Sequence, residues 1–209
     1  MATSTARENI ELQNPLYLVG YGSQARAWAS NLVDSGREVC IVLRKNSSSH
    51  EAVKSAGFKV ATQSLEDFRA SGPIRLLLLT PDETHQTILQ QLKDLPEGSE
   101  IVYAHGHSFV RHKLDEQFPL WRHCLLAPKA IAGEVRRRYL EKEAFGAIYD
   151  LRGAHVSEKA ENSLLHLAED LGVTFGPHKA SFEEETLADL FSEQSLLCSL
   201  IPYGAKKSF

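Results

Sequence analysis

The sequence predicts an α/β fold, a doubly wound, Rossmann-type, mostly parallel sheet with helices on both faces. Three observations predict it. Strand-like apolar runs alternate with helix-forming stretches along the chain, which is the pattern of successive βαβ units. The run at residues 74–80 is almost continuously apolar, as in a strand that is covered on both faces. The first run ends in the spacing G-x-G-x-x-A, which is typical of a dinucleotide-binding turn.

Residues 16–29 contain the first strand, its turn and the start of a helix, which is expected from about 23 to 34. Gly20 suits the tight turn, Gly22 lets the backbone approach phosphate oxygens, and Ala25 lets the helix pack close to the strand. The free N–H groups at the helix start would face the anion. A tight turn without a ligand is the alternative. The predicted cofactor-binding residues of this turn are Gly20, Tyr21, Gly22, Ser23 and Gln24.

The second strand is expected at residues 38–43, and a polar loop follows it at 44–49. In a dinucleotide fold this loop meets the adenosine ribose, and an acidic residue there favours a free 2′-hydroxyl. Here the loop offers two cations and three serines, which suit a 2′-phosphate and therefore NADP(H). A solvated serine-rich loop is the alternative. The predicted contacts are Arg44, Lys45, Ser47 and Ser49.

The alternation continues to the end of the predicted sheet. Further strands are expected at residues 59–62, 74–80, 100–104, 124–127, 145–151 and 173–175, with helices at 84–92 and 157–171, a short helix capped by Ser64, and a basic helix before residue 145. Ligands of such sheets bind beyond the carboxyl ends of the strands. Five polar strand ends should therefore converge on one cleft. These ends are residues 20–22, residues 44–49, Thr80-Pro81-Asp82, His105-Gly106 and Pro128-Lys129.

A helical pattern at residues 182–198 has a different character. Leu187, Leu190, Phe191 and Leu197 share its apolar side, while Glu185, Asp189 and Glu193 recur every four residues on one face. Neighbouring carboxylates at this spacing repel one another, and no lysine or arginine lies between them. The face is either solvated or a cation site, for which oxygen ligands suit Mg²⁺.

Composition places the chain among ordinary globular proteins. It has 209 residues, 43% hydrophobic and 24% charged, with a net charge of −4, so neither a nucleic-acid nor a membrane partner is expected. Three cysteines, Cys40, Cys124 and Cys198, have no C-x-x-C spacing and are expected to be reduced, buried thiols of a cytoplasmic protein. Residues 1–14 are expected to form a flexible extension.

Taken together, these residues resemble the ketol-acid reductoisomerase (acetohydroxy acid isomeroreductase) family from about residue 16 to 198. The motifs that carry the resemblance are Gly20-Tyr21-Gly22-Ser23-Gln24, Asn31-Leu32, Asp34-Ser35-Gly36, Leu43-Arg44-Lys45, Ala56-Gly57-Phe58, Leu79-Thr80-Pro81-Asp82, Ala104-His105-Gly106, Ala127-Pro128-Lys129, Val135-Arg136, Tyr139, Asp189-Leu190-Phe191-Ser192-Glu193-Gln194 and Leu197-Cys198.

The resemblance implies an NADPH-dependent oxidoreductase of branched-chain amino-acid (isoleucine and valine) biosynthesis. Such an enzyme uses two Mg²⁺ ions to move an alkyl group within 2-acetolactate or 2-aceto-2-hydroxybutyrate and then reduces the product with hydride. By resemblance, Asp189 bridges the two metals, Glu193 binds one of them, and Lys129 supports the substrate and metal oxygens. His105 lies near the reacting centre, so His105 and Lys129 are the candidate catalytic residues.

Three departures from the family pattern stand out. His107-Ser108 and the segment Ala130-Ile131-Ala132-Gly133 replace the family residues that normally follow His-Gly and Ala-Pro-Lys. The all-helical domain, which supplies two further glutamate ligands, is not present in these 209 residues. The resemblance therefore divides the chain into a flexible extension (1–14), an NADP-binding domain (15–181) and the start of a truncated helical domain (182–209). We expect the isolated chain to bind NADPH without turning over acetolactate, and the full-length protein to be a homo-oligomer.

Two other functions remain open from the sequence: a non-catalytic NADP-binding regulatory module, and a metal-independent hydroxy-acid dehydrogenase. Some residues also have simpler explanations. Asp82 could be a helix N-cap, Arg136-Arg137-Arg138 a solvated basic turn, and Trp28 and Phe191 core residues, while a zinc pair of His105 and His107 is disfavoured. The other histidines, His85, His112, His123, His155, His166 and His178, are expected at the surface or behind the site.

Overall fold

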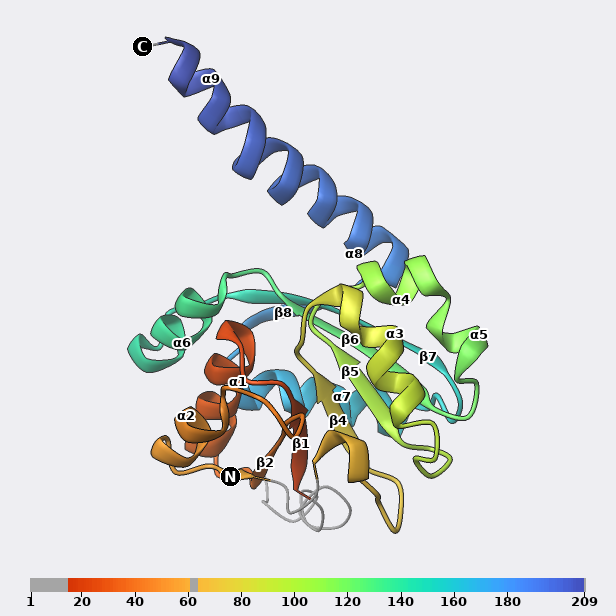
Figure 1. The fold of residues 1–209 in the computed structure, drawn as a ribbon. Coiled ribbons are helices and arrows are strands. Elements are labelled where there is room, and N and C mark those ends of the chain that lie inside the picture. The colour runs from red at the N-terminus through yellow and green to blue at the C-terminus, as the bar shows by residue number, and fades with distance from the viewer. Residues whose placement is uncertain (1–14, 61–63, 209) are drawn as a thin grey trace, which may run out of the picture.

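The computed structural model describes residues 15–60 and 64–208, and within them the predicted doubly wound sheet is confirmed (Figure 1). Its eight described strands lie in the order β3-β2-β1-β4-β5-β6-β7-β8. Neighbouring strands are parallel except β6 and β7, which are antiparallel. The strands are β1 (Leu16–Val19), β2 (Val39–Val42), β3 (Lys59–Val60), β4 (Arg75–Leu78), β5 (Glu100–Tyr103), β6 (Arg122–Pro128), β7 (Gly146–Gly153) and β8 (Phe175–Lys179).

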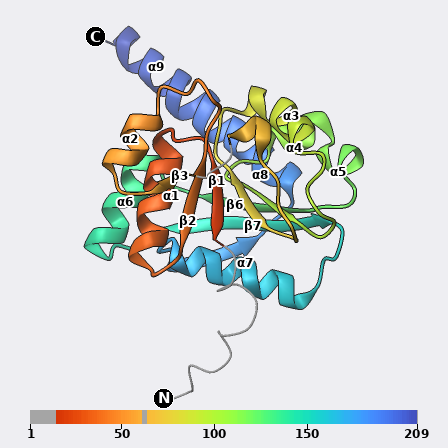
Figure 2. The same ribbon diagram turned by 60° about the horizontal axis from the view of Figure 1, so that its bottom comes forward.

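Helices cover both faces of the sheet, as Figure 2 shows. Alternate side chains of each strand enter one of two apolar layers. In β4, for example, Leu77 packs with α1 (Ser23–Asp34), α6 (Ala132–Glu141) and α7 (Glu158–Asp170). Leu76 and Leu78 instead pack with α3 (Asp82–Gln91), α4 (His107–His112), α5 (Leu114–Gln117) and the start of α8 (Phe182–Asp189). The fully buried Trp28 lies in the first layer, so its prediction as a core residue is confirmed.

The strand order reverses between β1 and β4. From β1 the chain builds β2 and β3 on one side, then crosses back to place β4 on the other side of β1. The connections after β1 and β4 therefore leave the sheet in opposite directions and open a crevice at the carboxyl ends of these strands, where such folds bind ligands. The glycine turn lies at this position.

Three short helices were not predicted: α2 (His50–Ser55), α4 and α5. Each has six residues or fewer, which is too short to display a 3.6-residue apolar period. Ser64 precedes only a single 3₁₀ turn, η2 (Leu65–Asp67), and makes no side-chain cap. The predicted strand at 59–62 is described only as Lys59–Val60, because residues 61–63 lie outside the described part, as does the predicted 1–14 extension.

The C-terminal helix begins against the sheet and then leaves it (Figure 1). Ser181 and Glu184 form a capping box at its start, and Phe182 is buried on Phe109 with ring centroids 3.8 Å apart. The π-helical stretch η3 (Leu190–Leu200) and α9 (Ile201–Ser208) continue it away from the sheet. Phe191 is 65% exposed, so its prediction as a core residue is wrong.

Leu187, Leu190 and Leu197, the other residues of the predicted apolar side, are also exposed. Leu187 is 72% exposed because it lies on the side of α8 opposite the buried Glu185, Thr186 and Asp189. Leu197 is 59% exposed on η3, where the helix has left the sheet. Cys198, on the same helix, is exposed, which contradicts its prediction as a buried thiol; Cys124 is buried, Cys40 is partly buried, and all three are free. Among the described residues, no helix combines the length and apolar character needed to cross a membrane.

Candidate functional site

The turn after β1 requires glycine for two reasons. Gly20 has φ +93°, a conformation that L side chains rarely adopt. A Cβ atom there would lie 2.7 Å from Cγ2 of Thr80. Thr80 lies two residues after the end of β4, on the other side of the crevice. The turn and Thr80 are thus in direct contact at the point where the strand order reverses.

The same turn leaves space for a phosphate. A Cβ atom on Gly22 would meet no heavy atom within 4 Å, and helix α1 begins at the next residue. Gln24 lines the adjoining pocket, and its buried Oε1 has no hydrogen-bond partner in the described part of the chain. Open space and free helix N–H groups fit a dinucleotide pyrophosphate. The Gln24 oxygen can only accept a hydrogen bond, so it does not contribute to that fit.

The loop after β2 is solvent-exposed and partly engaged. Arg44 and Lys45 are both exposed, and Lys45 Nζ lies 2.9 Å from the Asp67 carboxylate. The backbone N–H of Ser49 donates to Ser47 Oγ over 3.2 Å. Three of the five predicted strand ends line the pocket described next. The glycine turn adjoins that pocket through Gln24, at the start of α1, and the 44–49 loop does not line it.

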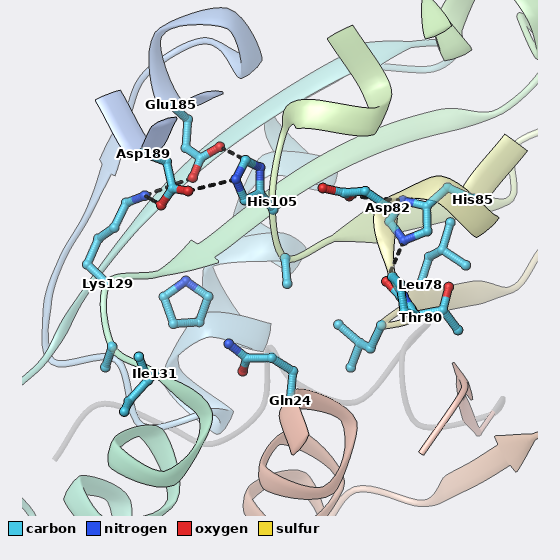
Figure 3. Close-up of a pocket in the computed structure, with 15 residues that line it drawn as sticks. Gln24, Leu78, Thr80, Asp82, His85, His105, Lys129, Ile131, Glu185 and Asp189 are labelled. Atoms are coloured by element: carbon cyan, nitrogen blue, oxygen red, sulfur yellow. Dashed lines mark hydrogen bonds and ion pairs between the residues drawn. The ribbon is translucent and has the colours of Figure 1, made fainter. Parts of the chain in front are cut away.

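Figure 3 shows the pocket that these three ends share. The β4 end contributes Thr80, Pro81 and Asp82, the β5 end contributes His105, and the β6 end contributes Pro128 and Lys129. Ala130 and Ile131, from the segment that departs from the family pattern, complete the wall beside α6. The remaining wall comes from the first turns of α8, through Glu185 and Asp189.

Four charged or titratable side chains form the polar cluster of this pocket: His105, Lys129, Glu185 and Asp189. Lys129 Nζ lies 2.8 Å from Glu185 Oε1 and 3.7 Å from Asp189 Oδ1. His105 Nε2 lies 2.7 Å from Asp189 Oδ2. Glu185 and Asp189 are buried, whereas the Lys129 and His105 side chains are 36% and 30% exposed. Two cationic or proton-donating groups thus offset two carboxylates at the pocket wall.

Hydrogen bonding defines the tautomer of His105. The backbone N–H of His107 donates to His105 Nδ1 over 2.9 Å, so Nδ1 acts as an acceptor. In the neutral ring the proton is then on Nε2, which donates to Asp189. The structure therefore holds His105 as a hydrogen-bond donor to Asp189.

Glu185 was missing from the predicted site residues, although its four-residue spacing from Asp189 was visible in the sequence. It is 2% exposed and accepts the backbone N–H of Gly106 over 2.9 Å. A Cβ on Gly106 would lie 2.6 Å from Thr186 Oγ1 and 2.7 Å from the Phe182 carbonyl oxygen. Glycine at position 106 therefore lets α8 pack close to the segment after β5. Lys129, directly after β6, supplies the positive charge that pairs with the α8 carboxylates.

A cation could use part of this cluster. Nδ1 or Nε2 of His105 and one oxygen each of Glu185 and Asp189 all lie within 4.8 Å of one another. The two carboxylates are the kind of donor that Mg²⁺ takes. The backbone of Glu193, the other predicted metal ligand, lies in η3, but its side chain lies outside the described part of the structure.

Asp82 does not cap a helix, which contradicts that explanation. It is the first residue of α3, and Pro81 is the N-cap. Its carboxylate lies 3.6 Å from His85 Nδ1 and 3.5 Å from His107 Nδ1. His107 thus faces Asp82 while His105 faces Asp189.

Two of the remaining histidines lie inside the protein. His85 is 3% exposed and close to the site, as predicted, but His123 is fully buried in the core, where the prediction is wrong. His123 bonds the Tyr103 hydroxyl over 2.9 Å and the Phe118 carbonyl over 3.1 Å. Burial lowers the pKa of both imidazoles, which disfavours their charged form.

The arginines of the basic turn in α6 form hydrogen bonds and ion pairs with residues of this same chain. Arg136 binds Asn31 Oδ1 over 2.9 Å and Asp34 over 2.7 Å. Arg137 pairs with three glutamates, Glu134, Glu141 and Glu143. These contacts fasten α6 to α1 and to its own neighbours, and favour a structural basic turn over an anion site.

Comparison with known proteins agrees with the geometry. Residues 13–176 match the family model of the acetohydroxy acid isomeroreductase NADPH-binding domain. A ketol-acid reductoisomerase (NADP(+)) of Corynebacterium aurimucosum is 33% identical over 196 residues, which are 92% of this chain and 56% of that protein. The chain therefore spans little more than half the length of this relative.

Two solved structures share the fold. An NADH-preferring ketol-acid reductoisomerase from an uncultured archaeon has a TM-score of 0.76 at 28% identity, covering 88% of this chain and 56% of its own. A semialdehyde dehydrogenase NAD-binding protein from Cupriavidus necator, in complex with calcium and NAD, has a TM-score of 0.72 at 15% identity, covering 93% and 73%. The second likeness concerns the fold alone. By its family match, this chain belongs to the ketol-acid (acetohydroxy acid) reductoisomerases and contains their NADPH-binding domain.

Proposed function

We propose that this chain binds NADPH in the crevice between β1 and β4 and contributes its pocket to a ketol-acid reductoisomerase reaction on 2-acetolactate or 2-aceto-2-hydroxybutyrate, in isoleucine and valine biosynthesis. The observation that carries the proposal is the contact of the Gly20 turn with Thr80 at the strand reversal. It supports the proposal because the turn adjoins, through Gln24, a pocket that holds His105, Lys129, Glu185 and Asp189.

The predicted residues divide the cofactor between two places. Gly20, Tyr21, Gly22, Ser23 and Gln24 would hold the pyrophosphate, and Thr80, Pro81, Asp82, His105 and Gly106 would border the nicotinamide. Arg44, Lys45, Ser47 and Ser49 would meet the 2′-phosphate, which favours NADPH over NADH. Since Asp67 already pairs with Lys45, Arg44 is the cation we expect to dominate this preference.

In the complete site, NADPH would supply the hydride and two Mg²⁺ ions the Lewis acidity. Asp189 and Glu193 would hold the metal, with Glu185 beside them. Lys129 Nζ would support negative charge on substrate oxygens, since it reaches the pocket wall from β6. His105, held as an Nε2–H donor, would orient the Asp189 carboxylate.

We expect the described part of the chain to supply only part of such a site. Glu185 and Asp189 already share Lys129 and His105 as partners, so few carboxylate oxygens are left for cations. We therefore expect the 209-residue chain by itself to bind NADPH without oxidising it in the presence of 2-acetolactate. We also propose a cytoplasmic location, which three unpaired cysteines favour, and a homo-oligomeric state for the full-length enzyme.

Cofactor titration tests the central proposal. The purified chain is titrated with NADPH and with NADH, following the nicotinamide fluorescence, and Arg44→Ala is titrated in parallel. We expect NADPH to bind at least tenfold more tightly than NADH, and the Arg44→Ala variant to lose most of this preference. Equal affinities would contradict the 2′-phosphate assignment, and failure of both nucleotides to bind would contradict the proposed function.

A second assay addresses the chemistry. NADPH absorbance is followed with 2-acetolactate in the presence and in the absence of Mg²⁺. No oxidation is expected for the chain alone. Steady oxidation that requires Mg²⁺ would show that the chain is catalytically complete, and oxidation that does not require it would favour a metal-independent dehydrogenase.

A further inference from the structure

His85 connects two loops that border the pocket. It lies on the first turn of α3 and is 3% exposed. Its Nε2 lies 2.8 Å from the Thr80 carbonyl oxygen, and its Nδ1 lies 2.6 Å from Oγ of Ser108, which is 1% exposed. Figure 3 shows the ring beside Thr80 and Asp82.

The direction of both hydrogen bonds follows from the groups involved. A carbonyl oxygen can only accept, so Nε2 carries the hydrogen and donates to Thr80. Nδ1 of the neutral ring must then accept, and the Ser108 hydroxyl donates to it. The imidazole thus links α4 to the segment after β4: it accepts a hydrogen bond from Ser108 of α4 and donates one to the Thr80 carbonyl oxygen.

Both ends of this chain of bonds are attached to the site. Thr80 packs its methyl group against Gly20, with so little space that an added Cβ would lie 2.7 Å away. Ser108 follows directly after His107, whose backbone N–H donates to His105, and lies two residues after Gly106, which donates to Glu185. His85 therefore lies between the phosphate turn and the polar cluster.

We propose that His85 is a positioning residue that joins the Gly20 turn to the polar cluster and so sets the shape of the pocket between them. The inference rests on the proposed function in one respect, because NADPH is the ligand whose affinity reports this shape. The imidazole acts through Thr80 and Ser108. A phenylalanine of similar volume would fill the space without joining the two loops.

The experiment compares His85→Phe with His123→Phe. The control is well matched, because His123 is equally buried, also has both ring nitrogens bonded, and does not line the pocket. Ser108→Ala removes one half of the bridge without changing the ring. In His85→Gln, the side-chain amide can still donate to the Thr80 carbonyl. Each variant is measured for thermal unfolding and for its NADPH dissociation constant.

We expect His85→Phe to weaken NADPH binding about tenfold, Ser108→Ala about threefold, and His85→Gln less than His85→Phe. His123→Phe should lower the unfolding temperature while leaving the dissociation constant within twofold of that of the wild type. Equal affinity changes in His85→Phe and His123→Phe would overturn the proposal, since they would indicate a general loss of packing. A wild-type chain that binds no NADPH would instead contradict the proposed function.

A second measurement does not depend on the cofactor. Backbone amide resonances of Gly20 and His107 should both move in Ser108→Ala and in His85→Phe. The bridge ends at Thr80, which packs against Gly20, and at Ser108, which follows His107. Neither resonance should move in His123→Phe. Unchanged resonances at either loop in the two bridge variants would overturn the inference whether or not NADPH binds. Ser108→Ala retains a test if His85→Phe does not fold.

Discussion

The glycine turn and the polar cluster border the same pocket but are built in different ways. The turn is made of consecutive residues, and its geometry depends on one strand, one helix start and the neighbouring Thr80. The cluster joins His105 after β5, Lys129 after β6, and two carboxylates on α8. Its members are far apart in sequence: His105 and Asp189 are separated by 84 residues. A local motif can be identified from its residues, whereas a cluster of this kind depends on how three segments meet.

Substituting the two glycines of the turn separately tests how far its geometry is local. Gly20→Ala should cost about 3 kcal/mol of unfolding free energy, because it combines a positive φ with a clash against Thr80. Gly22→Ala should cost less than about 0.5 kcal/mol, since its added methyl meets open space. Chemical denaturation measures both.

NADPH titration of the same two variants separates folding from binding. Gly22→Ala should weaken NADPH binding despite its near-native stability, because its methyl would occupy the space proposed for the pyrophosphate. Native affinity in Gly22→Ala would show that the phosphate does not approach this residue. Native stability in Gly20→Ala would show that the turn relaxes without cost, and the turn would then depend less on its local geometry than we infer.

The second prediction concerns the cluster. Glu185→Ala should lower the unfolding free energy by about 2 kcal/mol, because it leaves the buried Gly106 N–H without an acceptor and removes the nearest partner of Lys129. Glu183→Gln is the control, on the same helix but exposed and paired with Arg152 at the surface. Denaturation curves for both variants make the comparison. Similar losses for the two would show that the cluster does not hold α8 against the sheet.

The third and smallest effect is a dependence of stability on pH. Burial lowers the pKa of His85 and His123 from an ordinary 6.5. These two side chains therefore bind protons more readily in the unfolded chain than in the folded one. The stability that the neutral histidines contribute is fully present above pH 6.5 and is lost as the pH falls below that value. We expect the unfolding free energy to fall by about 1 kcal/mol between pH 7.5 and 5.5, with a shallower fall in His123→Phe. An unchanged slope in that variant would contradict the assignment.

A buried ion pair behaves differently at lower pH. Burial by itself would raise the pKa of Glu100, but Arg75 and Arg122 outweigh it and lower that pKa. The stability that ionised Glu100 contributes is thus retained until the pH falls below the ordinary carboxyl range. This ion pair therefore does not contribute to the fall in unfolding free energy near pH 6. The two histidines are therefore the groups to test in the neutral range.

Much of the fold was predictable from the sequence. The helix after the glycine turn was expected at about 23–34 and observed at Ser23–Asp34, because its start follows a small-residue turn and its end precedes Gly36. Most strand ends were placed within two residues, since apolar runs end where the sheet ends. The last strand is the exception: it was expected at 173–175 and is observed at Phe175–Lys179, a largely exposed strand at the sheet edge that has no apolar run. The short helices α4 and α5 were missed, because four to six residues carry no measurable period.

The alternating α/β order, the glycine turn and the polar residues after each strand could be predicted from the residues alone, since these depend on local conformation and on apolar periodicity. Which of the polar residues meet depends on how the elements pack. The tertiary structure brought Lys129 to the carboxylates of α8, added Glu185 to the site, placed the 44–49 loop apart from the pocket, and exposed Phe191 on a helix that leaves the sheet. The physical reason is that burial and charge pairing depend on which segments pack together, and residue spacing along one element does not contain that information.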